Sequence, residues 1–132
     1  MKNKVMHLMR RGAVTCLEEA TVREVAQIMV VNDIRYCVVI NAKHEVKGII
    51  SARSILKAYG QHLDSISARD ILLPHTETIG PSCDLREAVG IMSQKKIEHL
   101  IVVPDRPGSR AILGLLCARD IVDHMALEGE AA

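Results

Sequence analysis

The sequence predicts an α/β fold, classed as α+β in some schemes, that consists of two β-α-β-β-α repeats within 132 residues. Three observations lead to this prediction. The chain repeats itself at a constant offset, so that residues 22–24 match residues 85–87. Helical spacing of apolar residues is followed by strand-like runs in the same order in both halves. A Gly-led apolar stretch containing Ala-Arg occurs at residues 48–54 and again, with a slightly larger offset, at residues 114–120.

The first repeat opens with a short extended piece at residues 14–16. The next segment has one apolar helical face, formed by Val22, Val25, Ala26 and Met29. An apolar run at residues 36–40 is bounded by turn residues, which is typical of a buried strand. Residues 46–50 are expected to form a second strand that leads into a closing helix.

The second repeat follows the same order, starting at residues 78–79. Its helical face is formed by Leu85, Ala88, Val89 and Met92. The expected strands cover residues 100–103 and 111–116, and a loop at residues 104–109 containing Pro and Gly accounts for the larger offset that follows it. The expected boundaries of the two repeats are residues 5–60 and 67–126.

Each Gly-led stretch has the pattern of a strand that turns into a helix. The first amide groups of a helix lack internal partners and carry the positive end of its dipole, so an anion can bind there. Asp120 lies one turn into the second of these helices and can accept two hydrogen bonds from the paired hydroxyls of a sugar. Phosphate at the helix start and ribose on this acid would describe a nucleotide. The alternative is that Asp120 and its counterpart Ser54 only cap free amides of their own helices.

The composition argues against several other classes of protein. The net charge is +1, with 17 basic and 16 acidic residues, which gives no sign of a nucleic-acid or membrane-surface partner. Trp and Phe are absent, so we expect an aliphatic core and almost no platforms for base stacking. The basic start of the chain is followed by no long apolar run, so neither a signal peptide nor a membrane span is expected.

The cysteines and histidines do not form a recognisable reactive site. The four cysteines are widely spaced and are expected to be buried free thiols of a cytoplasmic protein. The six histidines show no metal-ligand spacing, and no catalytic triad or pair of carboxylates can be placed. We therefore expect no metal site, no required cofactor and no enzymatic activity.

From about Val5 to Met125 the chain resembles the tandem CBS domain pair, or Bateman module, named after cystathionine β-synthase. The resemblance rests on the two repeats, the Thr before each first helix, and the Gly-apolar-apolar-Ser/Thr-x-x-Asp stretch. It implies a pseudo-two-fold module with a cleft between the repeats, where AMP, ADP, ATP or S-adenosylmethionine can bind. It also implies homodimers of such pairs and a role in signal transduction, through a regulated protein that the sequence does not identify.

The resemblance further implies which residues contact the ligand. Asp120 matches the acid that holds the ribose hydroxyls, whereas Ser54, at this position in the first repeat, cannot replace a carboxylate. Cys117 stands where the family has a hydroxyl that helps to hold phosphate, and His99 could offer a charge that depends on pH. The principal site is expected to comprise Thr78, Ile79, His99, Ile101, Cys117, Arg119 and Asp120. The weaker second half-site is expected to comprise Thr15, Cys16, Tyr36, Val38, Ser51, Arg53 and Ser54.

Two functions follow from these observations. The first is a stand-alone CBS pair that senses an adenosine-containing ligand in one principal site. The alternative is a ligand-free structural module with a degenerate cleft, which dimerises through its helices.

Overall fold

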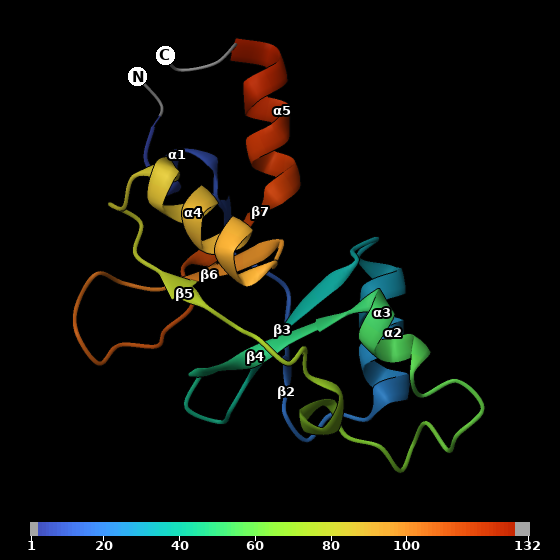
Figure 1. The fold of residues 1–132 in the computed structure, drawn as a ribbon. Coiled ribbons are helices and arrows are strands. Elements are labelled where there is room, and N and C mark those ends of the chain that lie inside the picture. Colours follow the sequence, from blue (N-terminus) through green and yellow to red (C-terminus); the bar gives the residue numbers. More distant parts are fainter. Residues whose placement is uncertain (1–2, 129–132) are drawn as a thin grey trace. The chain divides into compact units, whose positions relative to one another are not determined.

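The computed structural model describes residues 3–128, which divide into two compact units. Of these residues, 13–75 form the first unit, and 3–12 together with 76–128 form the second unit. Each unit contains one β-α-β-β-α repeat and its own small sheet (Figure 1). The mixed fold and the order of elements expected from the sequence are therefore confirmed.

The elements of the first unit are β2 (Thr15–Leu17), α2 (Val22–Val31), β3 (Tyr36–Ile40), β4 (Val46–Ser51), α3 (Ala52–Leu56) and the 3-10 helix η1 (Ala68–Ile71). Its sheet has the order β2-β3-β4, with β2 parallel and β4 antiparallel to β3. Helix α2 begins with a reciprocal cap, in which the Glu24 amide donates to the Thr21 hydroxyl and the Thr21 amide donates to the Glu24 carboxylate. Val25 and Met29 of this helix pack on the sheet, as its apolar face predicts.

The elements of the second unit are α1 (Val5–Leu8), β1 (Arg10–Arg11), β5 (Thr78–Ile79), α4 (Leu85–Lys95), β6 (His99–Val102), β7 (Gly114–Cys117) and α5 (Ala118–Glu128). The sheet order is β1-β7-β6-β5. Asp84 caps α4 by accepting a hydrogen bond from the Arg86 amide at 2.8 Å. The core beneath α4 is aliphatic, as expected from the absence of Phe and Trp. Strand β7 is shorter than expected because residues 111–113 still belong mainly to the preceding loop.

The short segment before the first repeat belongs to the second unit, and the short segment before the second repeat belongs to the first unit. The Val5 amide donates to the Cys83 carbonyl at 2.9 Å, and the Ala68 amide donates to the Ala20 carbonyl at 2.7 Å. These two contacts are related by the same offset that relates the repeats. The expected repeat boundaries, 5–60 and 67–126, therefore differ from those of the compact units. Helix α1 and strand β1 have no counterpart among the expected elements because both are too short to show a periodic pattern.

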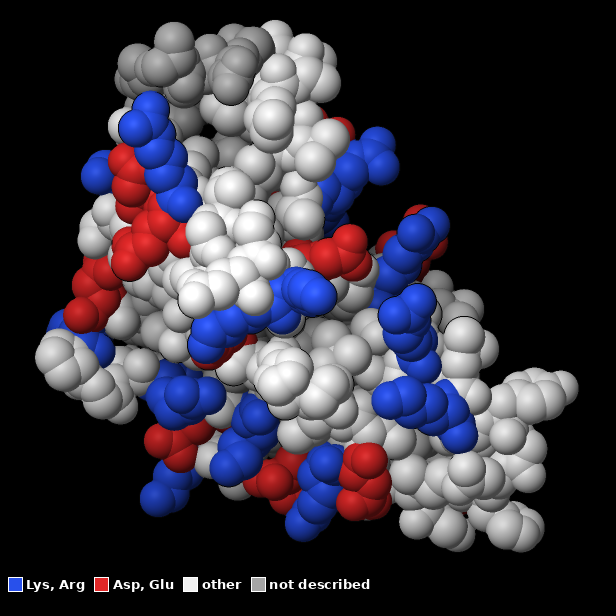
Figure 2. Space-filling model, in the orientation of Figure 1, with Lys and Arg blue, Asp and Glu red and all other residues white. Residues whose placement is uncertain are grey.

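The surface charge is mixed. Figure 2 shows basic and acidic side chains interspersed on the face that it draws, in keeping with the net charge of +1. Such a distribution creates no strong electrostatic field of one sign, so the binding of a charged ligand depends on individual charged side chains.

Candidate functional site

Four of the seven residues expected in the principal site share one face of the sheet in the second unit. Side chains alternate along β6, and Leu100 and Val102 belong to the hydrophobic core, so His99 and Ile101 point to the opposite face. The register of the sheet places Cys117 beside His99 and Thr78 beside Ile101. The side chain of Ile79 belongs to the core instead. The structure thus brings Thr78, His99, Ile101 and Cys117 together.

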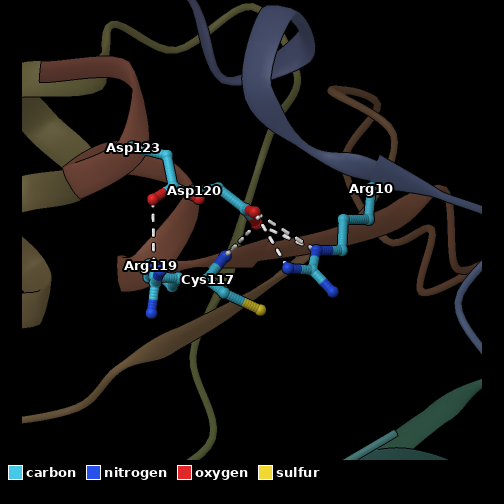
Figure 3. A network of polar contacts seen from close by, with 5 residues as sticks. All are labelled: Arg10, Cys117, Arg119, Asp120 and Asp123. Carbon is cyan, nitrogen blue, oxygen red and sulfur yellow. Dashed lines mark hydrogen bonds and ion pairs between the residues drawn. The ribbon is translucent and has the colours of Figure 1, made fainter. Parts of the chain in front are cut away.

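Asp120 lies in the first turn of α5, directly after β7. Its Oδ2 accepts a hydrogen bond from the Cys117 amide at 3.3 Å, so the carboxylate does cap its own helix. The same carboxylate is held by Arg10 of β1, as Figure 3 shows. Arg10 Nε lies 3.2 Å from each carboxylate oxygen, and Nη2 lies 3.1 Å from Oδ1. The hydrogen bond and the negative charge of Asp120 raise the pKa of Arg10.

Arg10 was not among the residues expected in the site. Its position is set by β1, which pairs antiparallel with β7 so that Arg10 lies opposite Leu115. Its contact with Asp120 joins residues 110 positions apart. A basic pair near the start of the chain was the only signal in the sequence, and many solvated surfaces carry such a pair.

Arg119 is not directed toward Asp120. Its Nε lies 2.9 Å from Oδ1 of Asp123, one turn further along α5, and its side chain is largely exposed (Figure 3). Such a pair is a common stabiliser of a helix surface. The expected phosphate contact of Arg119 requires this pair to open.

Two buried groups of this face are kept neutral by their surroundings. Burial lowers the pKa of His99 below its usual value of 6.5, although the charge of Glu98 opposes this shift. Burial, and then the charge of Asp120, raise the pKa of Cys117 to about 11. At neutral pH the His99 imidazole is therefore mainly uncharged, and the site offers its charges through Asp120 and Arg10.

The first unit repeats this geometry with different chemistry. Thr15 lies beside Val38, and Tyr36 lies beside Ser51, at the positions that correspond to the pairs of the second unit. Cys16 belongs to the core, where the hydrogen bond between its thiol and that of Cys37 raises the pKa of Cys37. Arg53 is exposed at the start of α3.

Ser51 and Ser54 close the start of α3 on themselves. The Ser54 amide donates to the Ser51 hydroxyl at 3.2 Å, and the Ser51 amide donates to the Ser54 hydroxyl at 3.3 Å. The two hydroxyl oxygens are 3.2 Å apart, and Ser54 is only 2% exposed. The residue that corresponds to Asp120 is thus a buried cap, and its position carries no charge.

Other kinds of site find no support in the part of the chain that the structure describes. Between residues 3 and 128, no three His, Cys, Asp or Glu side chains are grouped to hold a metal ion. Over the same range, no helix has the length and apolar character needed to cross a bilayer.

Comparison with known proteins identifies relatives for the whole of both repeats. The family model described as CBS domain matches residues 5–61 and 66–127. The chain is 30% identical over 116 residues to the uncharacterized protein MK0525 of Methanopyrus kandleri, a match that covers 86% of the chain and 58% of that protein. It is 28% identical over 115 residues to an inosine-5'-monophosphate dehydrogenase of Halobacterium salinarum, of which the match covers 22%. The chain therefore spans less than two thirds of the length of either relative.

Solved structures show the same architecture. The CBS domain pair of protein MJ0100, in complex with 5'-methylthioadenosine and S-adenosyl-L-methionine, superimposes with a TM-score of 0.84 at 20% identity, covering 97% of this chain and 99% of that one. The CBS domain protein PAE2072 from Pyrobaculum aerophilum, complexed with AMP, has a TM-score of 0.80 at 26% identity and covers 96% and 97% of the two chains. Because its sequence identity is low, the likeness to MJ0100 concerns the fold alone.

Proposed function

The chain belongs to the CBS domain family as a tandem pair of these domains, and we propose that it is a regulatory sensor that binds an adenosine-containing ligand at Asp120. The single observation that carries this proposal is the Asp120 carboxylate, placed at the start of α5 beside the face that holds Thr78, His99, Ile101 and Cys117. Two vicinal hydroxyls of a ribose can each donate to one oxygen of such a carboxylate. The ligands bound in the structures of two similar CBS proteins all contain adenosine, which supports this class of ligand.

The role that we propose is regulatory and not catalytic. Burial raises the pKa of the Cys117 thiol to about 11, so almost none of the thiolate that nucleophilic attack requires is present at neutral pH. A ligand changes the state of the protein only through a difference in its affinity for two conformations, and a partner protein or a second copy of the chain then reads this change. No cofactor is required in this mechanism.

The test is calorimetric titration of ligand-stripped protein with AMP, ADP, ATP, S-adenosylmethionine and adenosine. The Asp120→Asn variant keeps the shape of the side chain but loses its charge, and we expect it to bind any ribosyl ligand about 10- to 100-fold more weakly. Asp64→Asn, which removes the same charge from an exposed ion pair of the first unit, is the matched control and should leave the affinity unchanged. Equal affinities of wild-type protein and Asp120→Asn would remove Asp120 from the site.

A second candidate function is favoured by the exposed apolar side chains of the first unit. Val30 and Val31 at the end of α2, and Leu56 and Tyr59 in and after α3, are each at least 70% exposed. A homodimer that covers these side chains would be a ligand-free interaction module. Sedimentation of the protein with and without AMP distinguishes the two functions, because this module would dimerise equally in both samples and bind no nucleotide.

A further inference from the structure

Most of the acceptor capacity of Asp120 is used within the protein itself. A carboxylate offers about four acceptor positions. Three N–H groups use these positions in Asp120: the Nε–H of Arg10 is shared between Oδ1 and Oδ2, Nη2 of Arg10 donates to Oδ1, and the Cys117 amide donates to Oδ2. About one position is left, which is too few for two hydroxyl donors. A ribose that donates two hydrogen bonds to this carboxylate must therefore displace Arg10.

Arg10 is able to leave without disturbing the fold. Its backbone is held by the pairing of β1 with β7, but its side chain is 61% exposed, whereas that of Asp120 is 17% exposed. The exposed guanidinium stays hydrated when it leaves, and the hydroxyl groups of the ribose replace it as donors to the carboxylate. A ligand can thus compete for the carboxylate at a modest cost in free energy.

The second unit has both charged residues of this pair, and the first unit has neither. By the offset that relates the two repeats, the counterpart of Arg10 is Leu73, whose amide donates to the Ile49 carbonyl at 2.8 Å. Ile49 is in turn the counterpart of Leu115, the residue opposite Arg10. Ser54 is the counterpart of Asp120. The corresponding segment of the first unit makes this backbone hydrogen bond but forms no strand, and both charged residues of the pair are replaced there.

We infer that Arg10 is a displaceable occupant of the ribose-binding carboxylate, and that it thereby makes the site selective for adenosine ligands that carry an anionic group. This inference rests on the proposed function. Once displaced, the guanidinium remains tethered to β1 next to the site. A phosphate group on the ligand gives it a new bidentate partner. A neutral nucleoside leaves it without one, and a cationic ligand such as a sulfonium compound is repelled.

The experiment compares the affinities of adenosine and 5'-AMP for wild-type protein and for Arg10→Gln. Without Arg10, neither ribose competes with the guanidinium, so adenosine should bind about 3- to 10-fold more tightly. AMP gains the same relief but loses a stronger, bidentate contact to its phosphate, so it should bind more weakly by a similar factor. The dissociation constant of adenosine divided by that of AMP should therefore fall by about tenfold or more. Arg10→Lys keeps the charge but lacks the planar fork, so its ratio should lie between the other two.

Arg11→Gln is the matched control, since it removes the same charge from the next residue of β1 and should leave the ratio unchanged. An equal fall of the ratio in Arg11→Gln would mean a general charge effect, and unaltered adenosine binding in Arg10→Gln would mean that Arg10 does not compete. Either result overturns the inference while AMP binding that depends on Asp120 would keep the proposed function. If neither compound binds to any of these folded proteins, the inference is wrong, and the titrations with ADP, ATP and S-adenosylmethionine decide the proposed function separately. Circular dichroism and thermal unfolding establish that the variants are folded.

Discussion

The side chains of His99 and Cys117 face each other across the antiparallel strands β6 and β7. The Ala118 amide donates to the Glu98 carbonyl at 2.8 Å just beyond them, so they form a non-hydrogen-bonded pair, the kind in which opposite side chains come closest. Both residues are buried, and burial favours the neutral form of each. The protein should therefore lose stability in acid, where His99 gains a proton, and in alkali, where Cys117 loses one.

We expect the stability of the protein to decrease in acid through His99. Because the pKa of His99 is lower in the folded state than its usual 6.5, the unfolded chain takes up a proton first as the pH falls through 6.5. The unfolding free energy of wild-type protein should then fall relative to that of His99→Gln, with a slope of at most about 1.4 kcal/mol per pH unit. Urea titrations between pH 8 and pH 5.5 measure this difference, and parallel curves for the two proteins would contradict it.

At alkaline pH we expect a loss of stability through Cys117. Its thiol has a pKa of about 11 in the folded state and 9.0 as its ordinary value, so the unfolded chain loses the proton first. The contribution of the neutral thiol to the unfolding free energy is fully present below pH 9. It is lost between pH 9 and pH 11, by about 2 to 3 kcal/mol in total. Cys117→Ala should lack this component. The check is the difference in unfolding free energy between the two proteins at pH 8 and at pH 10, which should change in favour of the variant.

Ser54→Ala should destabilise the first unit. The substitution removes the acceptor of the Ser51 amide, which lies buried at the start of α3. The expected cost is about 1 to 2 kcal/mol of unfolding free energy. Ser65→Ala, which changes an exposed serine of the same unit, should alter the stability by no more than about 0.5 kcal/mol. Equal midpoints of the two variants in urea would show that the reciprocal cap has no energetic role.

Gly114→Ala should weaken the attachment of β1 to β7. A Cβ at this position would lie 2.4 Å from the Arg10 carbonyl oxygen, so the two strands must separate, at a cost of about 1 to 3 kcal/mol. Gly90→Ala offers the opposite control, because a Cβ there, within α4, meets no atom within 4 Å. This second substitution should stabilise the protein by about 0.5 to 1 kcal/mol. Thermal unfolding of both variants should give shifts of opposite sign.

The repeated fold could be predicted because its signals are local. The apolar face of Val22, Val25 and Met29 needs only helical spacing, and the reciprocal cap of Thr21 and Glu24 needs only residues three positions apart. Strands β3 and β6 each contain an apolar run bounded by turn residues. Repetition at a constant offset then made each assignment in one half a check on the other. The same comparison of the two repeats shows an acid, Asp120, in the second repeat and Ser54 at the corresponding position of the first.

The chemical state of the site depends on contacts that no local pattern contains. Arg10 meets Asp120 only because the segment before the first repeat pairs with β7 of the second unit, a contact between residues 110 positions apart. The neutral forms of His99 and Cys117 result from burial, which is a property of the packed sheet. By itself the sequence determined the two β-α-β-β-α repeats and the single acid, because spacing and composition specify elements along the chain. The partner of that acid was decided only by the tertiary structure, because strand pairing and burial depend on segments that are distant in sequence.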